Sequence, residues 1–149
     1  MPPAVILVLA LSLMGGDKRS ERLIYATDNS RIDILDIGRS HKLIRTIEIP
    51  DSGRYLAMAV SARTGKLYVS SRDNDEVICV DLAAGSILWR RHFGKSVDSM
   101  TLTPDGKRLY VSFRDESGWR VAESAGGAEL SRIEPGTKQP AAAAPTVYG

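Results

Sequence analysis

Two Arg-Asp pairs stand at matching places in the sequence. Arg72-Asp73 and Arg114-Asp115 each follow a short apolar segment, and the pairs are 42 residues apart. A guanidinium group binds carboxylates and other oxyanions through parallel hydrogen bonds, so these four residues are candidate ligands for an anionic molecule. Alternatively, the pairs recur because a structural unit recurs, and they form solvated turns or ion pairs that contribute about 0–1 kcal/mol each.

His92 is the fifth candidate ligand-binding residue. It lies in the cationic segment WRRHFGKS, directly after Arg90 and Arg91. The alternative is an ordinary surface histidine near the end of a strand. Asp81 and Glu123 also occupy matching positions, and we interpret them as hydrogen-bond acceptors in turns rather than as an acid-base pair.

Other common reactive motifs are missing from the sequence. His41 and His92 are 51 residues apart, and no metal-binding spacing, nucleophile elbow or glycine-rich phosphate loop occurs. Cys79 is the single cysteine, which excludes an intramolecular disulfide and indicates a small packed hydrophobe. We therefore predict no cofactor, no metal site and no catalytic residue, although a catalytic site assembled from distant loops would leave no such motif.

The elements that must position these residues form a repeat. Tyr25, Tyr68 and Tyr110 open three comparable segments at separations of 43 and 42 residues. The apolar residues alternate, as in Leu67 with Val69, which favours strands over a helical repeat. In the last copy we expect strands at 98–103, 108–113, 120–124 and 129–134, with a loop at 114–119.

Four antiparallel strands in about 43 residues is the size of one β-propeller blade. The segment TPDGKRLYVSFRDESGWRVAES, and more loosely SARTGKLYVSSRDNDEVICVDLAAG, resembles the repeat of the YVTN-type β-propeller family. The resemblance covers residues 22–136 and implies an all-β, partial β-propeller of about three four-stranded antiparallel blades, at 22–55, 56–97 and 98–136. It says almost nothing of activity, because similar propellers include surface-layer, binding and enzymatic proteins.

Three blades are insufficient to close a ring alone, since propellers close with about four to eight. The first copy lacks its innermost strand unless the apolar run at 5–11 supplies it. Residues 137–149 are expected to be a loose tail or a truncated blade. We therefore expect other propeller blades, from a longer chain or by self-association, to cover the terminal faces.

The propeller arrangement would gather the candidate residues on one rim. Loops from the second to the third strand of each blade share that rim with loops from the fourth strand to the next blade. Residues 28–30, 72–75 and 114–116 belong to the first kind, and 51–54 and 92–98 to the second. Ligands of propellers often bind there, although the sequence does not indicate which ligand.

The N-terminal apolar run from Ala4 to Met14 is too short to cross a bilayer, which needs roughly 20 residues. It is typical of an export signal, so residues 1–16 are a predicted signal peptide and the protein is expected in the periplasm or outside the cell. No Lys or Arg precedes the run. The alternative is a buried strand, in which case we expect a cytoplasmic protein.

The composition, with 43% hydrophobic and 26% charged residues, is that of a soluble globular protein. The net charge of +2 comes from scattered residues, so nucleic acid is not an implied partner. The leading hypothesis is an exported, non-enzymatic propeller segment that acts as a binding or scaffold module. The alternative is part of a lactonase-like or quinone-linked amine dehydrogenase-like propeller enzyme, with catalytic residues in missing blades or another subunit. A truncated product without independent function is the third possibility.

Overall fold

The computed structural model of the chain describes residues 7–12, 21–28 and 30–136. Within these residues, twelve strands form three four-stranded antiparallel sheets, each in sequence order. Blade 1 contains β1 (Leu7–Ser12), β2 (Glu21–Asp28), β3 (Arg31–Asp36) and β4 (Lys42–Glu48). Blade 2 contains β5 (Tyr55–Ser61), β6 (Lys66–Ser71), β7 (Glu76–Asp81) and β8 (Ser86–His92). Blade 3 contains β9 (Val97–Leu102), β10 (Arg108–Phe113), β11 (Glu116–Glu123) and β12 (Glu129–Ile133).

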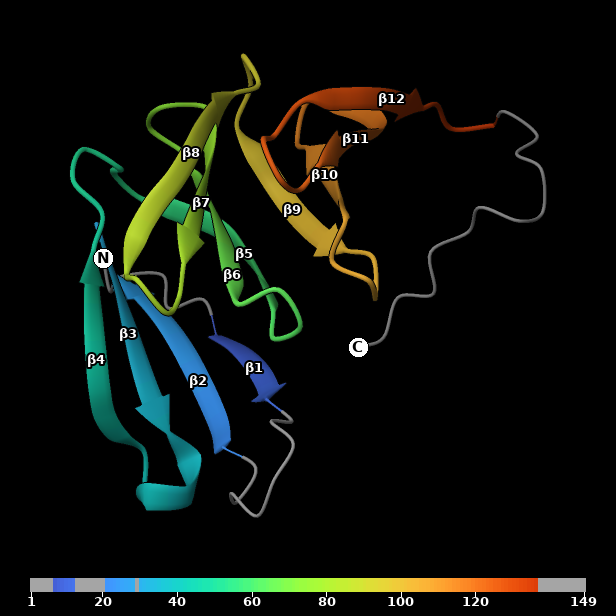
Figure 1. Cartoon of the computed structure of the whole chain (residues 1–149). Helices are drawn as coiled ribbons and strands as arrows, with labels where there is room; N and C mark the ends of the chain where they lie inside the picture. The colour runs from blue at the N-terminus through green and yellow to red at the C-terminus, as the bar shows by residue number, and fades with distance from the viewer. Residues whose placement is uncertain (1–6, 13–20, 29, 137–149) are drawn as a thin grey trace.

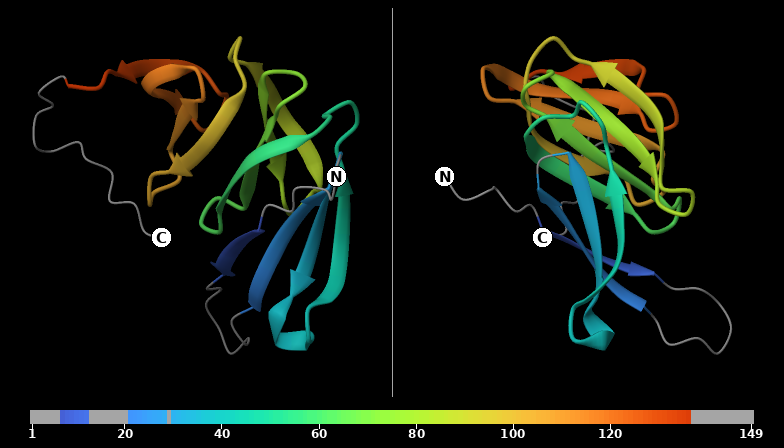
Figure 2. Two further views of the ribbon diagram at one scale, coloured as in Figure 1. Left: turned by 180° about the vertical axis from the view of Figure 1, so that it is seen from behind. Right: turned by 90° about the vertical axis from the view of Figure 1, so that its left-hand side faces the viewer.

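The three sheets stand side by side around a common inner side (Figures 1 and 2). Their first strands are neighbours: β1 lies beside β5, and β5 lies beside β9. The last strands, β4, β8 and β12, form the outer edges of the sheets (Figure 1). The predicted all-β fold of three four-stranded antiparallel blades, none closed into a ring, is therefore confirmed.

One strand of blade 3 begins well before its predicted range. The third strand of blade 3 begins at Glu116, so the expected loop at 114–119 shrinks to Arg114 and Asp115. Gly118 permits this, because its φ of 93° brings the backbone so close that a Cβ there would lie 2.2 Å from the Ile133 carbonyl oxygen.

Blade 1 has its innermost strand, because β1 pairs with β2 from Leu7 opposite Ala26 to Ser12 opposite Glu21. The N-terminal apolar run thus forms a strand, which was the alternative to a signal peptide. A cleaved signal peptide and a structural β1 exclude each other in one mature molecule, and export stays a prediction. The predicted tail at 137–149 lies outside the described residues.

One apolar core joins blades 1 and 2. It uses alternate residues of each strand, so that β6 contributes Leu67 and Val69 and β7 contributes Ile78 and Val80, all with no exposed surface. Blade 1 supplies Ile32, Ile34, Ile47 and Ile49. The alternation of Leu67 with Val69 in the sequence thus reflects the face of β6 that this core buries.

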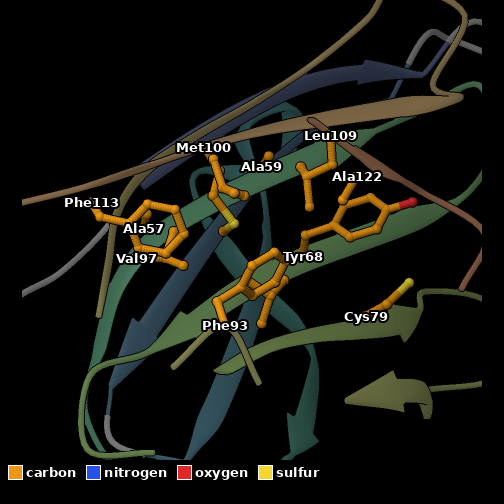
Figure 3. Close-up of a cluster of buried hydrophobic side chains, with 12 residues drawn as sticks. Ala57, Ala59, Tyr68, Cys79, Phe93, Val97, Met100, Leu109, Phe113 and Ala122 are labelled. Atoms are coloured by element: carbon orange, nitrogen blue, oxygen red, sulfur yellow. The ribbon is translucent and has the colours of Figure 1, made fainter. Parts of the chain in front are cut away.

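A second core joins blades 2 and 3 and is shown in Figure 3. The intervening residues of the same strands build it, including Tyr68 on β6 and Cys79 on β7, both without exposed surface. Blade 3 contributes Val97, Met100, Leu109, Val111, Phe113 and Ala122. Blade 2 is thus covered on both faces, which explains its nearly continuous apolar strands.

Arginines of the outer strands attach each blade to a turn of the next one. Arg45 of β4 donates to the carbonyl oxygens of Leu82 and Ala83 at 2.9 Å each, and to that of Ala84 at 3.0 Å. One blade further on, Arg91 of β8 donates to the carbonyl of Gly127 at 3.1 Å. At both blade interfaces, therefore, an arginine of the outer strand binds a main-chain carbonyl in a turn of the next blade.

Candidate ligand-binding rim

The loops predicted to share a rim do so. The amide of Arg72, in the β6–β7 loop, donates to the carbonyl of Arg54 in the β4–β5 loop at 2.8 Å. The amide of Phe93, which begins the β8–β9 loop, donates to the carbonyl of Asp75 at 2.9 Å. Backbone hydrogen bonds thus fix these loops relative to one another at one end of the sheets.

A cavity of about 130 Å³ lies at this rim between blades 2 and 3. Three of the five predicted residues line it, together with residues that no sequence motif marks. The described residues that line it are Leu56, Arg72, Ser96, Asp98, Arg114 and Asp115. We refer to it as the rim cavity.

The two arginines of the rim cavity differ in their partners. Arg114 donates through Nη2 to Asp98 Oδ1 at 3.3 Å, in a pair whose side chains are 65% and 45% exposed. Arg72 makes no side-chain hydrogen bond or ion pair with the part of the chain that the structure describes, and the same holds for the carboxylate of Asp115. The rim cavity therefore offers a free guanidinium and a free carboxylate.

Ser96 adds a hydroxyl group to this lining. Its Oγ is buried and has no hydrogen-bond partner among the described residues, the only such side-chain atom found in them. A buried hydroxyl without a partner costs about 1–3 kcal/mol. Because Ser96 lines the rim cavity, a rotation of its side chain would bring this hydroxyl to a ligand or a water molecule there.

Asp73 does not line the rim cavity. Its Oδ1 accepts from Arg54 Nη2 at 2.8 Å and its Oδ2 accepts from the Arg54 amide at 3.0 Å. The side-chain hydrogen bond from Arg54 is the main reason that the pKa of Asp73 lies below its ordinary value. The carboxylate also packs against Gly53, where a Cβ would lie 2.7 Å from Asp73 Oδ2. Asp73 thus holds two loops together.

His92 also lies apart from the rim cavity. Its Nδ1 is 3.0 Å from the carbonyl oxygen of Asn74, and its Nε2 is 3.8 Å from Glu76 Oε2. It lines a second cavity of about 280 Å³ with Arg91, Phe93, Arg120, Gly127 and Glu129. The guanidinium groups there are bonded to protein: Arg91 to Gly127, and Arg120 to Phe93 and Glu116.

An ion cluster supports the loop that carries Ser96. Arg120 donates to Glu116 at 2.7 and 3.0 Å and to the Phe93 carbonyl at 3.0 Å, and Lys95 lies 3.2 Å from Glu116. The Arg120 guanidinium carbon is 4.4 Å from the centre of the Phe113 ring. Chiefly through the Arg120 hydrogen bonds, the pKa of Glu116 falls to about 2. The β8–β9 loop is therefore anchored to blade 3 on both sides of Gly94.

Among the described residues, no group of three or more His, Cys, Asp or Glu side chains is arranged to hold a metal ion. None of their helical segments has the length and apolar character needed to cross a membrane.

The rim cavity offers hydrogen bonds and charges of both signs to a small ligand.

No family model matches the chain, and no curated protein matches it either. Solved structures do match it. Hydrazine synthase of Kuenenia stuttgartiensis is 19% identical, with a TM-score of 0.66 over 76% of this chain and 33% of that one. The Cps50 (Swd1) β-propeller domain of Myceliophteria thermophila is 15% identical, with a TM-score of 0.61 over 74% of this chain and 34% of that one.

Saccharomyces cerevisiae Sqt1 is 11% identical, with a TM-score of 0.66 over 87% of this chain and 36% of that one. The fold is that of a β-propeller. At these identities the similarity establishes the fold alone, and the chain spans about a third of the length of each of these structures. The expected propeller fold is thus confirmed, whereas no match connects the chain to the YVTN family.

Proposed function

We propose that this chain is an exported propeller segment of the YVTN type that acts as a binding or scaffold module. In this proposal its terminal faces are covered by further blades, supplied by a longer chain or by a second copy. The observation that carries the proposal is the face of blade 3 that points away from blade 2. The proposed binding function uses the rim cavity.

That face repeats the face of blade 2 that blade 3 covers. On blade 2, Tyr68 and Ser70 point toward blade 3, where Tyr68 donates to the Ser124 carbonyl at 3.3 Å and Ser70 to the Val97 carbonyl at 3.1 Å. Tyr110 and Ser112 stand 42 residues later, at the same places of β10. They alternate with Leu109, Val111 and Phe113, which pack on blade 2.

The exposure of this face also differs from that of its counterpart. Tyr68 has no exposed surface, whereas Tyr110 is half-buried, and Trp119 on the neighbouring strand is 39% exposed. In the repeat, Trp119 corresponds to Val77, which is completely buried. An aromatic face with the residue pattern of a blade interface is a surface suited to another blade.

The mass of the protein in solution tests this proposal. We expect light scattering to give a complex heavier than the single chain, and we expect Tyr110→Asp to shift it toward the single chain. Leu88→Asp is the matched control, because Leu88 is 45% exposed on the outer strand of blade 2, away from that face. A soluble, cooperatively folding single chain at high concentration would refute the need for a cover.

Export is tested separately by the intact mass of the protein recovered from each cell fraction. If export removes residues 1–16, protein outside the cytoplasm begins after Gly16 and its blade 1 lacks β1. Full-length protein found only in the cytoplasm contradicts export. That result would leave β1 as the role of the N-terminal apolar run.

A further inference from the structure

Positive and negative side chains line the rim cavity in equal number, but only one of each is engaged in an ion pair. Two guanidinium groups and two carboxylates surround it, so its formal charge is zero. Arg114 and Asp98 are paired with each other at 3.3 Å. Arg72 and Asp115 form no close ion pair with the described residues, and Arg72 acts on Asp73 only through its charge, so the lining presents one available cation and one available anion.

The uncharged part of the lining suits the same kind of ligand. Ser96 lines the rim cavity and its Oγ is buried without a partner, so a rotation of this side chain toward the cavity would let the hydroxyl donate to a carboxylate oxygen that Arg72 also binds. Leu56 contributes an apolar wall for a short alkyl group. The rim cavity therefore combines three features: Arg72 and Ser96 to bind a carboxylate, Asp115 to accept from an ammonium group, and Leu56 as an apolar surface.

The volume limits the ligand to a few atoms. The rim cavity measures about 130 Å³. This is far above the ~10–15 Å³ that one water molecule needs, and below the ~300–1,000 Å³ of sites for drug-sized ligands. A simple anion would face the carboxylates of Asp98 and Asp115, and a simple cation would face Arg72 and Arg114. Neither would use both available charges.

We propose that the rim cavity binds a small zwitterion, a molecule of amino-acid size that carries a carboxylate and an ammonium group. The carboxylate bonds Arg72 and Ser96, and the ammonium group bonds Asp115. This inference rests on the proposed binding function, and it names the ligand class of that site.

The test is an NMR titration of the full-length protein with L-alanine, with propionate and ethylamine as probes that each carry one of the two charged groups. We expect alanine to shift the amide signals of the loops at 72–75 and 93–96 in a saturable way. We expect propionate and ethylamine to bind at least about tenfold more weakly, because each leaves one charged group of the protein unused.

Three variants assign the contacts. Arg72→Gln and Asp115→Asn should each weaken alanine binding about tenfold or more, as expected when a charge-assisted hydrogen bond is lost. Ser96→Ala should weaken binding without lowering the stability of the free protein, because its hydroxyl has no partner there. Arg63→Gln is the control, since Arg63 is exposed in the β5–β6 turn at the opposite end of blade 2.

The inference is overturned if none of the probes binds, if propionate or ethylamine binds as tightly as alanine, or if the three variants bind alanine like the unmodified protein. Native mass spectrometry of the same samples keeps this separate from the proposed blade assembly. A complex that binds no alanine refutes the ligand class alone. A single chain that binds alanine refutes the assembly alone.

Discussion

Replacing Arg120 by methionine tests how the rim is held to blade 3. The Arg120 side chain is only 10% exposed. Methionine keeps much of its aliphatic stem and removes the guanidinium group. The change removes two hydrogen bonds to Glu116 and one to the carbonyl of Phe93. It also removes the contact with the Phe113 ring. The Phe93 carbonyl and most of the Glu116 carboxylate then lose their donors.

The expected cost follows from the exposure of the two partners. Removing one partner of a fully buried pair costs about 3–5 kcal/mol. Glu116 is 22% exposed and keeps Lys95 at 3.2 Å, so its charge stays partly compensated. We therefore expect Arg120→Met to lower the free energy of unfolding by about 2–3 kcal/mol at pH 7. Arg114→Met should cost less than about 1 kcal/mol, because the Arg114–Asp98 pair is exposed.

The pH dependence gives a second measurement. Arg120 is the main cause that moves the pKa of Glu116 from 4.5 to about 2. A lowered pKa stabilises the fold above the unfolded-state value, and that contribution disappears as the pH falls from about 4.5 toward 2. The stability difference between the unmodified protein and Arg120→Met should therefore narrow over this range.

Urea unfolding followed by tryptophan fluorescence at several pH values provides the assay. An Arg120→Met variant that loses less than about 0.5 kcal/mol at pH 7, within the usual range for surface changes, would refute this account of the ion cluster. So would a loss that stays equal between pH 7 and pH 2. In either case the β8–β9 loop would be held by its apolar contacts.

Three further predictions concern the interface of blades 2 and 3. Tyr68→Phe should cost about 1 kcal/mol, since it removes the hydrogen bond to the Ser124 carbonyl, whereas Tyr110→Phe in the isolated chain should cost almost nothing; urea unfolding compares them. Burial raises the pKa of the Cys79 thiol to about 11, so a thiol reagent at pH 8 should react only after unfolding, and rapid reaction of folded protein would contradict the burial. Gly127→Ala should lower the thermal midpoint, because φ is 73° and the new Cβ would lie 2.9 Å from the Trp89 ring; an unchanged midpoint would mean that the turn can relax.

The strands of the repeat are predictable because their signals are local. Pro104 and Gly106 mark a turn. The segment that follows alternates apolar and polar residues, and it forms β10 over the predicted range. The early start of β11 could not be predicted in the same way. Gly118 is typical of a loop in the sequence, and only the close carbonyl of Ile133 on β12 shows that it lies within a strand.

The rim on which the candidate site lies was predictable from the sequence, but the set of residues that line the rim cavity was not. The Arg-Asp pairs lie in the expected rim loops, yet the two residues of the first pair separate: Arg72 lines the rim cavity and Asp73 binds Arg54. Arg54 is 19 residues from Asp73 in the chain, so no local pattern joins them. Ser96 is likewise one serine in a loop, and only the packing of two blades buries its hydroxyl.

The arginine contacts between blades have a consequence for how such a chain can be built. Arg45 and Arg91 bind main-chain carbonyl groups of the next blade, not its side chains. Every residue type supplies that carbonyl, so the turn that receives the arginine can vary in sequence as long as its backbone shape and its glycine are kept. A duplicated or transplanted blade would therefore bring the polar contact with it, and only the apolar faces of the two neighbouring blades would have to match.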